Sequence, residues 1–184
     1  MKGTSHAAVG LLAGVTVAVV TWKSKELLGI PIEPIAVVLT SAAGALKADF
    51  DQKNSSGRRG YEFLWALAEK TPLVSKFFGH RGWATHSYWV PAFIIYIAFL
   101  LIGGGETKVS TIIGSLLIGS AIGFISHCHL DVYNSKGAPL LFPIPFKFSL
   151  ASVISDSWQE AVFIPIVILG MIAHITLLLM EVTL

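Results

Sequence analysis

Two residues that could hold a metal ion follow directly on a long apolar run. His127 and Asp131 come just after the run from Val109 to Ile125, and they stand four positions apart. In a helix this spacing puts both side chains on one face, one turn apart. An imidazole and a carboxylate on one face supply half of a metal site. A complete site therefore needs ligands from other segments of the chain.

The composition is that of an integral membrane protein. Hydrophobic residues make up 54% of the 184 residues, charged residues make up only 13%, and the mean hydropathy is +0.72. A soluble domain would carry roughly 25% charged residues. The net charge of +2 is too small to suggest nucleic-acid binding, and the single Cys128 cannot form an internal disulfide. We expect one membrane domain over residues 1–184 and no nucleic-acid partner.

Five apolar segments stand out along the chain, at about residues 7–22, 30–46, 88–103, 109–130 and 161–180. Their apolarity is continuous rather than alternating, which favours helices, and helices satisfy their own backbone groups in lipid. We expect an all-α integral membrane protein with about five transmembrane helices. The first three segments are short for a span of about 20 residues. They extend into flanking polar residues or are buried against their neighbours.

The connections between these segments also carry structure. We expect residues 47–87 to form an interfacial connection, in which residues 61–78 are amphipathic and broken near Pro72. The prolines between Ala138 and Leu150 argue against a spanning helix there, and this apolar stretch would dip into the membrane or cover a site. Ser157, with Glu160 three residues later, is typical of a capping box that opens the last helix.

The distribution of positive charge predicts the orientation in the membrane. With five spans, one side of the membrane holds ten of the 13 Lys and Arg residues, and the other side holds Lys23, Lys25 and Lys108. The crowded side should be cytoplasmic. We therefore expect a multi-pass protein of the inner (cytoplasmic) membrane with its amino terminus inside and its carboxyl terminus outside.

The same five-span arrangement brings every strong candidate metal ligand to the cytoplasmic face. The candidates are His6, Asp49, Asp51, His80, His86, His127 and Asp131. Taken one by one, each has an ordinary interpretation, such as a polar tail, loop charge or a hydrogen-bonded pair. Together they favour a metal site, because ionisable residues near a membrane are costly unless they are used. His129, Gln52 and Ser126 are candidates for supporting contacts. We expect Cys128 and His174 to serve in packing.

Seven ligands exceed what one tetrahedral zinc ion takes, so we expect one or two divalent ions. Mixed His and Asp ligands suit zinc first, with manganese or iron as alternatives, whereas Mg²⁺ prefers oxygen. The sequence contains no Gly-x-Ser-x-Gly elbow and no phosphate-binding Gly-Lys-Ser/Thr loop. The expected nucleophile is therefore metal-bound water, and Arg81 would contact a phosphate and stabilise its developing charge.

These motifs resemble those of a known family, the membrane-bound metal-dependent hydrolases, some of which are labelled LexA-binding inner-membrane hydrolases. The matching stretches are Thr4–Gly10, Gly44–Ser55, His80–Ser87 and Ser126–Leu140, in the family's order. The resemblance implies a hydrolase similar in its His and Asp usage to zinc-dependent phospholipase C and nuclease enzymes. The chain departs from the family's Pro-Asp-x-Asp-His pattern, because Ala48 replaces the proline and Gln52 replaces the histidine. By the resemblance, this departure concerns one ligand of a second metal.

From these observations we expect a hydrolase that cleaves a phosphoester or related bond of a lipid-like substrate at the cytoplasmic face. Membrane lipids are its expected surroundings. Two other classes fit the sequence. One is a non-catalytic, metal-binding membrane regulator or anchor with a cytoplasmic protein partner. The other is a metal-ion transporter, which would need ligands along an intramembrane path, where the sequence places only His174.

Overall fold

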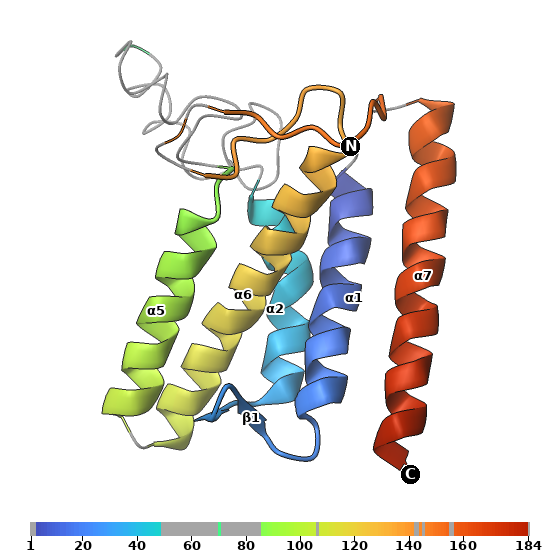
Figure 1. Ribbon diagram of the computed structural model, residues 1–184. Coiled ribbons are helices and arrows are strands. Elements are labelled where there is room, and N and C mark those ends of the chain that lie inside the picture. Colours follow the sequence, from blue (N-terminus) through green and yellow to red (C-terminus); the bar gives the residue numbers. More distant parts are fainter. Residues whose placement is uncertain are drawn as a thin grey trace.

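The computed structural model describes residues 3–48, 70, 86–105, 107–141, 144, 146–154 and 157–183. The described residues form five helices and one short hairpin (Figure 1). The helices are α1 (Gly3–Thr21), α2 (Pro34–Lys47), α5 (Trp89–Gly104), α6 (Lys108–Val132) and α7 (Trp158–Thr183). The expected amphipathic segment at 61–78 lies outside the described residues, apart from Lys70.

Each predicted apolar segment coincides with one of these helices, so the all-helical membrane fold is confirmed. By length and composition, α1, α6 and α7 are each able to cross a membrane, whereas α2 and α5 are shorter apolar helices. The first helix extends to Gly3, into the polar residues before its apolar run, as expected for a segment that looked short.

The second segment begins later than the sequence predicted. Ile30 and Pro31 form the strand β2, which pairs antiparallel with β1 (Glu26–Leu27). The turn residues Leu28 and Gly29 both have positive φ, the conformation that two-residue hairpin turns favour. Helix α2 then starts at Pro34, a residue well suited to the first helical position. The prediction placed residues 30–32 in the helix because they are apolar. In the structure they cover one end of the core and do not extend the helix.

Helix α6 lies at the centre of the bundle and packs against α1, α2 and α5, while α7 packs mainly against α1 (Figure 1). The amino-terminal ends of α1, α5 and α7 and the carboxyl-terminal ends of α2 and α6 lie at one end of the bundle. The hairpin lies at the other end. This arrangement gathers the ends of segments far apart in sequence, which is what a shared site requires.

Glycines let α2 and α6 approach closely. A Cβ atom at Gly123 of α6 would collide with the backbone of Ser41 and Ala45, and one at Gly44 of α2 would collide with the backbone of Ser120. Small residues at helix contacts are common in membrane proteins, because packing there replaces the hydrophobic driving force. The carboxyl-terminal half of α2 is thus held directly against α6, one turn before His127.

The connection after α6 folds back over the end of that helix. The amide of Leu150 donates to the Val132 carbonyl, and the amide of Val153 donates to the Tyr133 carbonyl. Ala138 and Phe148 pair in an antiparallel bridge. The described residues of this connection form turns and bridges and no helix, in agreement with the prolines in its sequence.

Candidate metal site

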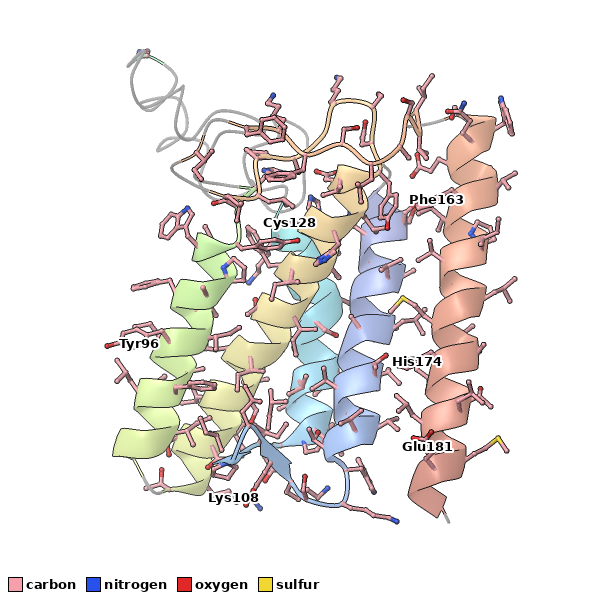
Figure 2. All side chains as sticks on the ribbon, in the orientation of Figure 1. Tyr96, Lys108, Cys128, Phe163, His174 and Glu181 are labelled. Atoms are coloured by element: carbon pink, nitrogen blue, oxygen red, sulfur yellow. The ribbon has the colours of Figure 1, made fainter. Side chains whose placement is uncertain are left out.

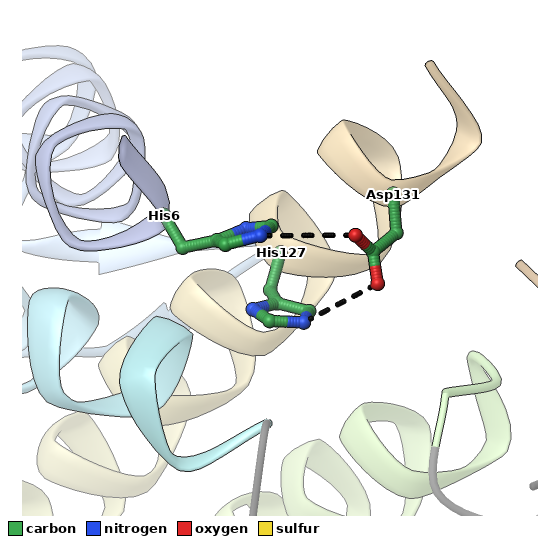
Figure 3. A group of neighbouring side chains, drawn as sticks. All are labelled: His6, His127 and Asp131. Atoms are coloured by element: carbon green, nitrogen blue, oxygen red, sulfur yellow. Dashed lines mark ion pairs between the residues drawn. The ribbon is translucent and has the colours of Figure 1, made fainter. Parts of the chain in front are cut away.

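Four predicted ligands from three parts of the chain meet at one end of the bundle. His6 comes from the first turns of α1, His86 precedes α5, and His127 and Asp131 belong to the last turns of α6. The Nε2 atom of His6 lies 3.7 Å from Asp131 Oδ1, and the Nε2 atoms of His86 and His127 each lie 3.6 Å from Asp131 Oδ2. Figure 3 shows the rings of His6 and His127 turned toward this carboxylate.

These separations are too long for hydrogen bonds; they are compatible with His–Asp ion pairs and with ligands around a shared ion. A nitrogen–oxygen hydrogen bond spans about 2.7–3.2 Å, and 3.6 Å is too long for one. Donor atoms at about 2.0–2.1 Å from a tetrahedral zinc ion lie about 3.3 Å from one another. The donor atoms of His6, His127 and Asp131 all lie within 4.8 Å of one another. A small inward movement would bring them to a common ion.

The contact between His127 and α2 orients the ring for metal binding. The Nδ1 atom of His127 lies 2.8 Å from the carbonyl oxygen of Ala45. A carbonyl can only accept, so Nδ1 carries the proton and donates it. In the neutral ring, Nε2 then directs its lone pair toward Asp131. Metal-binding histidines commonly use their second nitrogen in this way, which fixes both the tautomer and the orientation.

The stacking of His6 on His127 disfavours two protonated rings at the same time. The two ring centroids are 3.8 Å apart with an angle of 23° between the planes. Two positive rings this close would repel each other strongly, especially in a region where water cannot screen them. The neutral ring is the form that binds a metal ion.

All four side chains are almost fully buried, with between 0% and 1% of each residue exposed. Burial of a carboxylate is costly unless positive charge or hydrogen bonds compensate it. A divalent cation held by His6, His127 and Asp131 would add such charge. The donor set, its spacing and the tautomer of His127 therefore fit zinc, and nitrogen donors make Mg²⁺ a poor match.

The other candidates fall into two groups. Asp49, Asp51, Gln52, His80 and Arg81 lie outside the described residues. His129 and Ser126 are described, but their contacts point elsewhere. The hydroxyl of Ser126 donates to the Gly123 carbonyl of its own helix, and His129 contacts the Ile125 carbonyl and the hydroxyl of Tyr88.

Two supporting contacts were not predicted from the sequence. One is the Ala45 carbonyl, which is a backbone group and leaves no signal in residue type. The other is the hydrogen bond of 2.9 Å from the Ser5 hydroxyl to the carboxylate of Glu160, which is buried. The sequence pairs Glu160 with Ser157 as a capping box. Ser157 does accept from the amide of Gln159, while the Glu160 carboxylate holds the start of α7 to the residue before His6.

The comparison with known families agrees with the membrane fold. A family model described as the YdjM inner membrane protein matches residues 1–183. The chain belongs to the YdjM inner membrane protein family. Membership in YdjM, together with the apolar helices, places the protein in the inner membrane. No curated protein and no solved structure matches the chain. The family description names a location and no reaction, so hydrolysis remains a prediction from the motifs.

Proposed function

We propose that this member of the YdjM family is a metal-dependent hydrolase that cleaves a phosphoester or related bond of a lipid-like substrate. One observation carries the proposal: three imidazole Nε2 atoms surround a single buried carboxylate at 3.6–3.7 Å. Among the described residues, the group whose donor types and spacing could hold a metal ion consists of His6, His127 and Asp131.

In this proposal His6, His127 and Asp131 hold a divalent ion, with zinc preferred. Three protein ligands leave a tetrahedral ion one open position, which catalytic sites need. A bound zinc ion would lower the pKa of a water enough to supply a nucleophile near neutral pH. Ala45 keeps the His127 ring in its binding orientation. Arg81 is assigned to the phosphate of the substrate, because a guanidinium matches phosphate oxygens in a two-pronged contact.

The position of His86 bears on the number of ions. His86 and His127 both face Asp131 Oδ2, while His6 faces Oδ1. The group of donor atoms that lie within 4.8 Å of one another consists of His6, His127 and Asp131 and does not include His86. We assign His86 to a second ion, with Asp49, Asp51 and His80 as its further ligands. The replacement of the family's histidine by Gln52 would weaken that second site.

The proposed site faces the cytoplasm. The motivation is the excess of Lys and Arg on the side that holds the amino terminus and the connection 47–87. The cluster lies at the end of the bundle where α1 begins (Figure 1). A substrate would then be drawn from the inner leaflet.

The experiment is a hydrolysis assay with the zinc-loaded, full-length protein in vesicles of phosphatidic acid or of phosphatidylglycerol. Mass spectrometry follows the lipid, and a colorimetric assay follows released phosphate. We expect zinc-dependent turnover that falls at least about 100-fold in His127→Ala. The control is Glu181→Gln, an exposed substitution at the end of α7, which should retain activity. Metal-containing protein without zinc-dependent turnover on either lipid would contradict the proposal.

A structural metal site in a non-catalytic membrane protein is the second candidate. The near-complete burial of the four donors favours it, because structural zinc sites are closed and have four protein ligands. In this case His86 would complete the coordination of a single ion and join α1, α6 and the start of α5. One tightly bound ion, a large loss of stability on chelation and no turnover would support this candidate over the hydrolase.

A further inference from the structure

A long apolar groove lies between α1, α6 and α7. Its volume is about 690 Å³, within the range of roughly 300–1,000 Å³ typical of ligand sites. Its lining is mostly aliphatic and includes Val9, Ile122, Val167 and Met171. Figure 2 shows Phe163 and His174, two further lining residues, on the side of α7 that faces α1. The groove therefore extends along α7 from near its start to the level of His174.

A smaller cavity of about 370 Å³ lies at the end of the bundle where α6 ends. Three parts of the chain enclose it: Tyr88 before α5, the last turn of α6, and the connection after α6. That connection contributes Lys147 and Ser149 beside aromatic residues. It is anchored by the backbone hydrogen bonds that tie Leu150 and Val153 to the end of α6. The cavity is thus part of the folded structure.

The two cavities meet at His129 and Tyr133, which line both. His129 lies in the last turn of α6, and Tyr133, four positions later, caps that helix in a helical conformation, so the two residues share a face. His129 contacts the Tyr88 hydroxyl at 3.3 Å on the side of the small cavity. Tyr133 packs on the ring of Phe163, with the centroids 5.1 Å apart, on the side of the groove. The apolar groove and a cavity that contains polar groups therefore lie next to each other.

Charge distinguishes the two ends of this combined space. Lys147 carries the one fixed charge among the residues that line the two cavities, and no carboxylate lines either of them in the described chain. Phe146 and Leu150 beside it are 60% and 74% exposed. Large apolar side chains that are exposed on a connection between membrane helices contact the bilayer surface, which is the depth of lipid headgroups. The charged amino group of Lys147 thus lies at the depth where an anionic headgroup would be.

We propose that the groove and the small cavity form one binding site for an anionic phospholipid. An acyl chain fills the groove between α1, α6 and α7, and the headgroup lies in the small cavity with its negative charge toward Lys147. His129 and Tyr133 surround the junction of chain and headgroup. The site is separate from the metal cluster, because His129 is two positions from His127 and projects about 200° around α6 from it. It goes beyond the proposed hydrolase function.

The groove offers a substitution that fills it without disturbing the bundle. A Cβ atom at Gly170, which lines the groove, would meet no other atom within 4 Å. Gly170→Leu therefore places a side chain into the space assigned to the acyl chain. The matched control is Gly104→Leu on α5, where a Cβ atom also meets nothing within 4 Å and which lines neither cavity. For the headgroup, Lys147→Gln is matched by Lys136→Gln, an exposed lysine outside both cavities.

The experiment counts bound lipid by native mass spectrometry of the full-length protein in detergent. The probes are dioleoyl-phosphatidylglycerol, which is anionic, and dioleoyl-phosphatidylcholine, which is zwitterionic. We expect one phosphatidylglycerol per protein, with a preference over phosphatidylcholine that falls about fivefold in Lys147→Gln. Gly170→Leu should lose both lipids, while Gly104→Leu and Lys136→Gln should bind as the unmodified protein does. The same pattern is expected in Asp131→Asn, so loss of metal or of hydrolysis does not affect this result.

Equal retention of the two lipids, unchanged by Lys147→Gln, would overturn the headgroup assignment. Retention of phosphatidylglycerol in Gly170→Leu at the level of the unmodified protein would overturn the groove as the chain site. Equal loss in Gly170→Leu and Gly104→Leu would do the same, because it would trace the effect to the helices in general. Thermal unfolding of each variant in the same detergent separates a folding defect from a loss of lipid.

Discussion

The Nδ1–H group of His127 donates a hydrogen bond of 2.8 Å to the Ala45 carbonyl, which joins α6 to α2 at the metal cluster. The contact depends on backbone position, because the acceptor is a main-chain oxygen. Gly123 and Gly44 allow that position by letting the two helices approach closely. The orientation of a candidate metal ligand thus depends on helix packing one turn away.

This dependence predicts the effect of one added methyl group. In Gly123→Ala, the new Cβ would collide with the backbone of Ser41 and Ala45 and push α2 away from α6. We expect a loss of about 1–3 kcal/mol in stability and a loss of about 10–100-fold in metal affinity. Gly170→Ala, in open space within α7, is the control and should be neutral or slightly stabilising. Thermal unfolding and competition with a zinc chelator measure both quantities; an unchanged zinc affinity in Gly123→Ala would contradict the account.

The carboxylate at the centre of the cluster gives a second prediction. Asp131→Asn keeps the shape of the side chain but removes the charge that three imidazoles face. We expect the purified variant to retain less than about a tenth of the metal found in the unmodified protein. Glu181→Gln makes the same carboxylate-to-amide change at an exposed position and should leave the metal content unchanged. Elemental analysis of protein purified without added metal checks both variants.

Metal should also stabilise the fold. An ion that binds only the folded state, at about 100 times its dissociation constant, adds about 2.7 kcal/mol to the free energy of unfolding. We therefore expect zinc to raise the Tm of the unmodified protein and a chelator to lower it. Neither should shift the Tm of Asp131→Asn by more than a small fraction of this effect. A zinc-induced increase of the same size in both proteins would show that zinc binds elsewhere.

The sequence predicted the helices well because their apolar runs are long and uninterrupted. It failed at Ile30 and Pro31, where apolar residues belong to a hairpin that covers the end of the core. Hydropathy reports burial and does not distinguish a short strand from the first turn of a helix. Of the two positive-φ residues in the turn, Gly29 is typical of such a position, whereas Leu28 gives no signal of it.

The candidate site was predictable to the extent that residue types reveal it. Four ionisable side chains at the ends of apolar segments are costly to bury in or near a membrane, and the fold brings them together. They are His6, His86, His127 and Asp131. Their mutual distances could not be derived, because these depend on how closely α1 and α6 pack. The role of Glu160 was also hidden. The sequence pairs Glu160 with Ser157 in a capping box. In the structure, its carboxylate accepts a hydrogen bond from Ser5, 155 residues away.

That long-range bond supports a further prediction about the site. In Ser5→Ala, the Glu160 carboxylate loses the hydroxyl that holds α7 to α1 beside His6. We expect a loss of about 1 kcal/mol in stability and a modest weakening of metal binding. Thr176→Val is a fair control, because that hydroxyl donates to the Ile172 carbonyl within its own helix. If both variants unfold at the same temperature and bind zinc equally, the bond does not position His6.

The orientation in the membrane is testable with reporters. We expect alkaline phosphatase fused after Leu184 to be active and green fluorescent protein at the same position to be dark, because the carboxyl terminus should face outward. The converse result would put the metal cluster on the outer side and would contradict a substrate drawn from the inner leaflet. Fusion after Gly105, between α5 and α6, should report the outer side as well.

X-ray absorption at the zinc edge tests directly whether His6, His127 and Asp131 bind a zinc ion. The full-length protein is loaded with one equivalent of zinc and compared with Asp131→Asn. We expect nitrogen and oxygen ligands at about 2.0–2.2 Å with the multiple-scattering features of at least two imidazoles, and their loss in the variant. A sulfur ligand at about 2.3 Å, which would implicate Cys128, or a spectrum unchanged by Asp131→Asn, would contradict it.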